Sequence, residues 1–233
     1  MQIAILAGGL GTRLGPLTKD QPKSMVDVHG RPFLAWQLDL LRRQGVTDVV
    51  LCVGHLGDAI ARHFGDGSAF GVRLRYSDEG ERRLGTAGAL RWAQALLGEA
   101  FFVMFGDSYL LFDFRAIMEH FLARDRLALM VVHRNENRWN RSDVAVEEGH
   151  VTAYAATPRP GMVHINAGLS VLRRAALETI ASQRSASLQD LYAALIPQRQ
   201  LLAYETRQRF CEVGSLAGLE EFRRLVAEGG LPR

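Results

Sequence analysis

A glycine-rich segment near the amino terminus combines the residue types that bind phosphate. Residues 8–14 read Gly-Gly-Leu-Gly-Thr-Arg-Leu directly after a short apolar run, and Lys23 follows soon after. Glycines let backbone amides approach a phosphate closely, and two fixed cations, Arg13 and Lys23, would neutralise a triphosphate and its departing pyrophosphate. A tight turn with two solvated cations would have the same sequence, so the segment alone does not decide between the two.

Two common phosphate-binding motifs do not fit this segment. A dinucleotide-binding fingerprint needs a third glycine where Leu14 stands. A Walker A loop needs a glycine directly before Lys-Ser, whereas Lys23 and Ser24 follow Pro22. A glycine loop of another kind therefore remains.

The first half of the chain alternates short apolar runs with helical patterns. Such alternation predicts an α/β fold with a mainly parallel sheet covered on both faces, and ligands then bind where the loops leave the strands' carboxyl ends. The predicted strands are residues 2–7, 49–53, 72–76 and 101–105, and the predicted helices are residues 32–44, 58–64 and 86–97.

The second half of the chain has a less regular pattern. We expect it to cover one side of the same sheet. Its predicted strands are residues 127–132, 144–146, 150–155 and 169–172, and its predicted helices are residues 187–196 and 215–227.

Composition favours one globular domain over residues 1–233, a Rossmann-like three-layer α/β/α unit with a mainly parallel mixed central sheet. The chain is 48% hydrophobic, and its net charge of +3 comes from basic residues spread among acidic ones. This charge pattern fits a small anionic substrate, and we expect no nucleic-acid partner. Cys52 and Cys211 lie far apart without a metal-ligand spacing, and the first apolar run is too short for a signal peptide or a membrane span. We therefore expect a cytoplasmic protein with no membrane partner.

The opening motif closely resembles that of the sugar-1-phosphate nucleotidylyltransferase family. The resemblance rests on residues 8–14, then Pro16-Leu17-Thr18, then Pro22-Lys23. It implies the nucleotide-diphospho-sugar transferase fold, with Arg13 and Lys23 as catalytic residues that stabilise charge during transfer. It also implies that the nucleotide is bound by Leu6, Ala7, Gly8, Gly9, Gly11, Thr12 and Arg13.

Two acidic residues follow apolar runs later in the chain. The run 101–105 ends in Gly106-Asp107, which by itself is ordinarily a turn. The resemblance implies that Asp107 is catalytic and binds Mg²⁺, a hard cation that prefers oxygen ligands. Residues 210–215 resemble the family's Asp-Ile-Gly-Thr element, which implies Glu212 as a second metal ligand, although Glu212 is one methylene longer than the usual Asp. Ser215 would also cap the last helix.

Two further segments resemble substrate-binding elements of the family. Residues 84–89 resemble its Leu-Gly-Thr-Ala/Gly-Gly element, which implies that Gly85 and Thr86 contact the nucleotide and Gly88 the sugar. Thr86 can also cap the helix that begins there. Residues 165–169 resemble its Asn-Ala-Gly segment, which implies that Asn166 and Gly168 bind the sugar, although such a tripeptide is ordinarily a turn.

Three segments depart from the family pattern or stay open. The family's Glu-Lys-Pro appears as Ala156-Thr157-Pro158 or as Pro158-Arg159-Pro160, without the acid; Arg159 could replace the lysine charge. Residues 79–83 replace the usual Glu-Pro before Leu-Gly-Thr, so the edge that reads the base differs. The polar stretch 133–143 could be a lid over the sugar, and we favour an ordinary surface loop.

The resemblance implies attack by a sugar 1-phosphate oxygen on the α-phosphorus of an NTP, giving an NDP-sugar and pyrophosphate. Residues 1–110 would form the nucleotide-binding half and residues 111–233 the sugar-binding half, in a monomer or homodimer. Similarity to the mannose- and heptose-1-phosphate guanylyltransferase branch favours GTP with a mannose- or heptose-type sugar.

Two other functions stay open. One is a GT-A-type glycosyltransferase that consumes a nucleotide-sugar, although the segment at Asp107-Ser108-Tyr109 lacks that class's paired Asp-x-Asp. The other is a non-catalytic nucleotide-sugar-sensing subunit, which Glu212 and the missing acid would favour.

Overall fold

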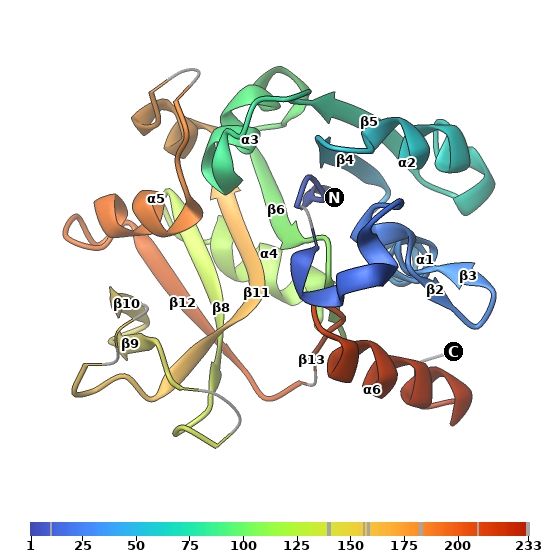
Figure 1. Cartoon of the computed structure of the whole chain (residues 1–233). Helices are drawn as coiled ribbons and strands as arrows, with labels where there is room; N and C mark the ends of the chain where they lie inside the picture. Colours follow the sequence, from blue (N-terminus) through green and yellow to red (C-terminus); the bar gives the residue numbers. More distant parts are fainter. Residues whose placement is uncertain are drawn as a thin grey trace.

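The computed structural model describes residues 1–9, 11–138, 141–155, 157, 159–181, 184–208 and 210–231, without the side chain of Thr12. A nine-stranded sheet runs through the molecule in the order β5-β4-β1-β6-β11-β8-β12-β10-β9 (Figure 1). Its strands are β1 Gln2–Leu6, β4 Asp48–Val53, β5 Arg73–Asp78, β6 Ala100–Phe105, β8 Ala128–Arg134, β9 Val144–Glu147, β10 His150–Tyr154, β11 His164–Arg173 and β12 Leu201–Thr206.

Among the described residues, two short ribbons and six α-helices accompany this sheet. The ribbons pair β2 Asp27–Val28 with β3 Arg31–Pro32, and β7 Ser108–Leu110 with β13 Phe210–Glu212. The helices are α1 Phe33–Arg43, α2 Gly57–Phe64, α3 Gly85–Trp92, α4 Phe114–Leu122, α5 Leu188–Leu195 and α6 Leu216–Ala227. Short 3₁₀ turns are η1 Thr12–Thr18, η2 Lys23–Met25, η3 Ser68–Phe70, η4 Gln94–Leu96 and η5 Arg174–Thr179.

The sheet is mixed, as the sequence predicts. Strand β1 pairs in parallel with β4 and β6, and β4 pairs in parallel with β5. Beyond β6, β11 is antiparallel to both β6 and β8, β12 is parallel to β8, and β10 is antiparallel to β12 and β9. Parallel pairing thus belongs to the four strands of the first half and to the β8–β12 pair.

The expectation that the second half covers one side of the sheet is wrong. Strands β11, β8, β12, β10 and β9 extend the sheet beyond β6. Their apolar runs, such as Leu129 to Val132, are buried on both faces because helices lie on both sides of them. Periodicity alone does not separate such a run from a covering hairpin, and it also leaves β12 and α4 without a prediction.

Alternating side chains divide the interior into two cores, one on each face of the sheet. On β1, Ile3 and Ile5 pack with residues of α1, α2 and α4, whereas Ala4 points to the opposite face with residues of α3 and α5. Figure 1 shows α3 and α5 in front of the sheet and α4 behind it. The predicted three-layer α/β/α arrangement is therefore present.

Helix α6 packs outside these layers against the β7–β13 ribbon. Phe222 of α6 contacts Phe33 of α1 edge-on, with ring centroids 5.2 Å apart, and Tyr109 of β7 at 4.8 Å. Ser215 caps α6 as predicted, since its hydroxyl accepts the Gly218 amide at 3.2 Å. These aromatic contacts form a third core, which holds in place the β7–β13 ribbon next to Asp107 and Glu212.

Within the described residues, none of the helices has the length and apolar character needed to cross a membrane.

Candidate active site

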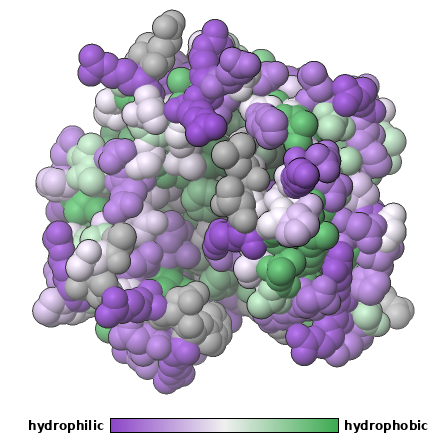
Figure 2. All heavy atoms as spheres, in the orientation of Figure 1, coloured by the Kyte–Doolittle hydropathy of each residue, from purple (hydrophilic) through white to green (hydrophobic). Residues whose placement is uncertain are grey.

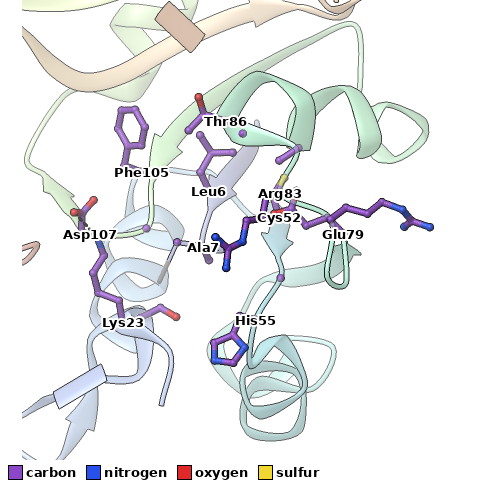
Figure 3. Close-up of a pocket in the computed structure, with 18 of the residues that line it drawn as sticks. Leu6, Ala7, Lys23, Cys52, His55, Glu79, Arg83, Thr86, Phe105 and Asp107 are labelled. Atoms are coloured by element: carbon purple, nitrogen blue, oxygen red, sulfur yellow. Dashed lines mark hydrogen bonds and ion pairs between the residues drawn. The ribbon is translucent and has the colours of Figure 1, made fainter. Parts of the chain in front are cut away.

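Asp107 lies at the centre of a small charge cluster. The residue is 8% exposed. Its Oδ2 is 2.5 Å from Nζ of Lys23 and 3.7 Å from Nη2 of Arg13. Figure 3 shows the Lys23 side chain reaching toward Asp107. The two cations and the carboxylate that sequence reasoning singled out therefore meet in space.

Adjacent parallel strands bring these groups together. Strands β1 and β6 end side by side, and the Gly106 amide donates to the Leu6 carbonyl at 3.0 Å, so the glycine loop starts next to Asp107. Gly11 then turns the loop back with a φ of 65°. A Cβ on Gly11 would lie 2.9 Å from Thr18 Cγ2 and 3.2 Å from Lys23 Cβ. The loop therefore needs glycine there to hold Lys23 close.

Glu212 reaches the cluster from the other end of the sequence. It pairs with Ser108 in the β7–β13 ribbon, and the next amide, of Val213, donates to the Asp107 carbonyl at 2.8 Å. Glu212 is exposed by surface area, yet neighbouring protein atoms partly desolvate its carboxylate and raise its pKa; the charge of Asp107 adds to the rise, and Arg13 and Lys23 oppose it. Two carboxyl groups thus share one electrostatic environment.

Gly214 makes room for this arrangement, and sequence reasoning assigned it no role at the site. A Cβ on Gly214 would lie 2.5 Å from Asp107 Oδ2 and 2.9 Å from Arg13 Nη2. Only glycine leaves Asp107 and Arg13 where they are.

A cavity of about 1080 Å³ opens beside the cluster. It is lined by loops that follow β1, β4, β5 and β6 and by the start of α3, which is the carboxyl edge of the parallel strands. Figure 2 shows that this mostly hydrophilic face is hollowed near its middle, with paler and apolar residues deeper. Lys23 and Asp107 line the cavity together with these predicted nucleotide-binding residues: Leu6, Ala7, Gly8, Gly9, Arg13, Gly85 and Thr86.

Other predicted residues lie outside this cavity. Within the described part of the chain, its lining does not include Gly11, Gly88, Asn166, Gly168 or Glu212, and the side chain of Thr12 lies outside the described residues. Gly88 packs on the segment before α5, where a Cβ would lie 3.0 Å from the Arg184 carbonyl.

Asn166 and Gly168 form a bulge inside β11. Asn166 Oδ1 accepts the Gly168 amide at 2.9 Å, and Gly168 has a φ of 82°. A Cβ on Gly168 would lie 3.1 Å from Ser108 Oγ. The bulge therefore lies against the residue that follows Asp107, although the nucleotide cavity does not include it.

Thr86 does not cap its own helix as predicted. Helix α3 has no side-chain cap, and Thr86 Oγ1 accepts the amide of Leu188 at 2.7 Å. The hydroxyl therefore ties α3 to the first turn of α5, whose own cap is Ser187 with a capping box to Asp190.

Further cavity residues lie in the loops after β4 and β5, which the sequence left without a role or only flagged as different. Cys52 is buried, and burial with the nearby Glu79 charge raises the pKa of its thiol to about 12. Burial also raises the pKa of Glu79, while the Leu84 amide opposes the rise. The sequence could have indicated these residues only by their position, because they lie at or after the carboxyl ends of strands, where ligands bind. The lining includes Cys52 near the end of β4 and the loop residues Gly54, His55, Glu79, Gly80, Glu81, Arg82 and Arg83.

The stretch 133–143 contains a closed hydrogen-bond network in its described part. Asn137 Oδ1 accepts the Ser142 amide at 2.8 Å, and Ser142 Oγ accepts the Asn137 amide at 3.1 Å. These bonds fit the favoured interpretation as an ordinary surface loop. Leu10, Trp139, Asn140, Ala156 and Pro158, which earlier interpretations include, lie outside the described residues.

Comparisons with known proteins find relatives of this chain. Residues 3–155 match the family model described as Nucleotidyl transferase. The chain is 30% identical over 221 residues to mannose-1-phosphate guanyltransferase beta-A of Xenopus laevis, covering 92% of this chain and 61% of that protein. It is 42% identical over 120 residues to the N-acetylmuramate alpha-1-phosphate uridylyltransferase of Neisseria meningitidis, covering 51% of this chain and 52% of that protein.

A solved structure shows the same fold. HddC from Yersinia pseudotuberculosis, solved in complex with GMP-PN, aligns with a TM-score of 0.80 and 25% identity over 97% of this chain and 99% of that one. The chain spans less than two thirds of the length of the two curated relatives. From the glycine loop, the charge cluster and the family match together, the chain belongs to the nucleotidyl transferase family.

Proposed function

We propose that the chain condenses an NTP with a sugar 1-phosphate, giving an NDP-sugar and pyrophosphate. The observation that carries this proposal is the Arg13–Lys23–Asp107 cluster at the edge of a cavity of about 1080 Å³ lined by the glycine loop. Relatives named for mannose-1-phosphate guanyltransferase activity support it. A glycosyltransferase would not need two cations in a phosphate loop, and a sensing subunit would not need the cluster intact.

In this reaction the chain's residues position the substrates and neutralise their negative charge. The phosphate nucleophile is ionised at neutral pH, so no protein nucleophile or general base is required. The glycine loop offers backbone amides to the triphosphate. Arg13 and Lys23 stabilise the negative charge that grows on the leaving pyrophosphate.

We propose Mg²⁺ as the cofactor, held by Asp107 and Glu212. The donor set fits, because both groups are carboxylates and the charge of Asp107 helps to raise the pKa of Glu212, a repulsion that a cation would relieve. The described residues hold no group of three or more His, Cys, Asp or Glu able to bind a metal, so substrate phosphates would supply the remaining oxygens. When bound, the ion would stabilise charge on the phosphoryl oxygens.

We propose GTP and a mannose- or heptose-type sugar 1-phosphate as the substrates. The frog relative's name and the GMP-PN bound to HddC support guanine. A second candidate is UTP, because the Neisseria relative is named a uridylyltransferase and is 42% identical over half of this chain.

A matrix of substrates tests this function. Purified protein is incubated with each of the four NTPs and several sugar 1-phosphates, including those of mannose and N-acetylmuramate, and pyrophosphate release is measured. We expect release that requires both substrates and is fastest with GTP. Absence of release from every pair would contradict the proposal, and release with UTP alone would replace the choice of nucleotide.

We further propose that residues 1–110 bind the nucleotide and residues 111–233 the sugar, in a cytoplasmic monomer or homodimer. The cavity lining, which runs from Leu6 to Asp107, supports the first half of this division. Cys52 is buried and forms no disulfide, which is compatible with a reducing compartment.

A further inference from the structure

Gln37 is a buried polar residue in the middle of helix α1. Its exposure is 1%, and the other buried residues of this helix are apolar: Phe33, Leu34, Ala35, Leu38, Leu40 and Leu41. A buried amide costs free energy unless its hydrogen bonds are made, so an apolar residue is the ordinary choice at such a position. The packing of the helix therefore does not explain why a glutamine stands there.

The side-chain amide of Gln37 is only half satisfied. Its Nε2 donates to the Ser108 carbonyl at 2.7 Å, whereas its Oε1 is buried and has no hydrogen-bond partner in the described part of the chain. A buried acceptor without a donor destabilises the fold. What the side chain provides in return is the bond to Ser108, which joins α1 to a residue 71 positions later.

The Ser108 carbonyl faces away from the ribbon to which Ser108 belongs. The amide of Val213 donates to the Asp107 carbonyl, and the register places Ser108 opposite Glu212. Hydrogen-bonded and non-hydrogen-bonded pairs alternate along an antiparallel ribbon, so Ser108 and Glu212 form a non-hydrogen-bonded pair. The β7–β13 ribbon has no third strand among the described residues, and Ser108 is 2% exposed. Gln37 therefore supplies a donor that neither a strand nor bulk water provides.

The backbone around Asp107 is held by three elements. Strand β1 accepts the amide of Gly106, the segment after β13 donates to the carbonyl of Asp107, and α1 donates to the carbonyl of Ser108 through Gln37. The first two links are main-chain contacts, whereas the third depends on a single side chain. A substitution of Gln37 therefore loosens this segment without altering either strand.

We propose that Gln37 is a positioning residue of the active site, whose amide fixes the backbone at Ser108 and so holds the Asp107 carboxylate in place beside Lys23. This inference rests on the proposed function. Gln37 is buried and outside the cavity lining of the described residues, so it acts through the backbone and not on a substrate. The Oδ2 of Asp107 lies 2.5 Å from Nζ of Lys23. A displacement of about 1 Å at a catalytic group can lower a rate about 100-fold, so a small movement of Asp107 has a large effect.

Pyrophosphate release by Gln37→Met tests the inference, with the substrate pair that the wild type uses best. Methionine keeps the length of the side chain and removes the donor. We expect kcat to fall about 10-fold or more, because Asp107 loses its fixed position, while KM for both substrates stays unchanged. The urea midpoint of unfolding stays close to that of the wild type, because the substitution removes the unpaired Oε1 together with the bond to Ser108.

Two comparisons separate a positioning role from a structural one. In the Asp107→Asn background, Gln37→Met has little further effect on kcat, because the carboxylate that Gln37 positions is already absent. Gln44→Met is the matched control, the same substitution at the C-cap of the same helix, and it leaves kcat and both KM values unchanged.

A folded Gln37→Met protein with the wild-type kcat would overturn the inference while the proposed function stands. An equal fall in kcat in the wild-type and Asp107→Asn backgrounds would overturn it too, because Gln37 would then act on a group other than Asp107. If Gln37→Met does not fold, Gln37→Glu takes its place, since an ionised carboxylate of the same shape cannot donate. Failure of both variants to fold would make Gln37 a structural residue and would also overturn the inference. A wild type that releases no pyrophosphate with any substrate pair refutes the proposed function itself, a different result.

Discussion

At the residue scale, the site is an ion cluster in which each group depends on the others. Asp107 is nearly buried, and a buried carboxylate is stable only with a close partner, which Lys23 provides. The more exposed Arg13 remains free to reach a substrate, since 68% of its side chain is accessible. The cluster therefore joins a fixed cation to a movable one.

Lys23→Ala removes the fixed cation. We expect kcat for pyrophosphate release to fall about 100-fold or more, the usual effect of deleting one group that stabilises transition-state charge. Steady-state kinetics measure it, with Lys19→Ala as the control, because Lys19 is exposed in the same segment. A rate within a few-fold of the wild type would show that Lys23 has no part in the transfer.

Gly214→Ala tests the packing around Asp107. The new methyl group would lie 2.5 Å from Asp107 Oδ2, so the carboxylate must move. We expect turnover to fall about 10-fold or more, since small displacements of catalytic groups are costly, while the circular dichroism spectrum stays that of the wild type. Gly98→Ala is the matched control, because its Cβ would meet only Gln2 Oε1 at 3.4 Å. Unchanged turnover in Gly214→Ala would mean that the position of Asp107 does not matter.

Sequence reasoning identified Arg13, Lys23 and Asp107 because they stand in a long motif or at a strand end. It did not identify the packing role of Gly214, since the need for glycine there comes from Asp107 and Arg13, which lie far earlier in the sequence. Nor did it place Cys52 and His55 in the cavity, which only the order of the strands shows.

At the element scale, short polar links join the elements that carry the cavity. Asp48 begins β4 and binds three neighbours: Gln2 of β1 at 2.8 Å, and Arg73 and Arg75 of β5 at 2.9 and 2.8 Å. Thr86 similarly joins α3 to α5. Each of these contacts joins two elements that are not neighbours in the sequence.

Thr86→Val removes the acceptor for the Leu188 amide and keeps the side-chain shape. We expect the free energy of unfolding to fall by about 1 kcal/mol, the usual value for such a bond. Urea unfolding measures it, with the exposed Thr47→Val as the control. No difference in the midpoint would show that the α3–α5 link contributes nothing to stability.

Asp48→Asn gives a pH-dependent loss of stability. Burial raises the pKa of Asp48, but hydrogen bonds from Arg73, Arg75 and Gln2 outweigh it and leave the pKa lowered. A carboxylate whose pKa is lowered in the folded state stabilises the fold at pH values above its unfolded pKa of about 3.9. This stabilisation is lost as the pH falls through the folded pKa. Asparagine should thus cost about 1 kcal/mol at pH 7, and the difference should shrink below pH 4. Urea unfolding at several pH values measures this, and a difference that grows in acid would contradict it.

The elements of the first half were predictable because strands and helices alternate with clear turn residues between them. Strand β11 was not, in its first part, because the predicted strand began at Leu169 and the bulge at Asn166 and Gly168 reads as a turn. Strand β12 carries apolar and polar residues without a clear period of two, and its pairing with β8 is what makes it a strand.

At the scale of the whole molecule, one continuous sheet supports both parts of the site. The parallel strands place the phosphate loop and Asp107 at their carboxyl edge, and β11 joins β6 so that its bulge meets the same edge. In the proposed reaction this continuity matters, because the NTP and the sugar 1-phosphate would react across the boundary between the two proposed halves. A rigid shared sheet holds both sides of that boundary in one geometry.

One measurement tests the central claim most directly: pyrophosphate release by Asp107→Asn, with the NTP and sugar 1-phosphate that the wild type uses best. The amide keeps the size of the side chain and removes the charge that pairs with Lys23. We expect kcat to fall about 100-fold or more in a variant that unfolds at a urea concentration close to that of the wild type. A folded Asp107→Asn protein that releases pyrophosphate at nearly the wild-type rate would contradict the account.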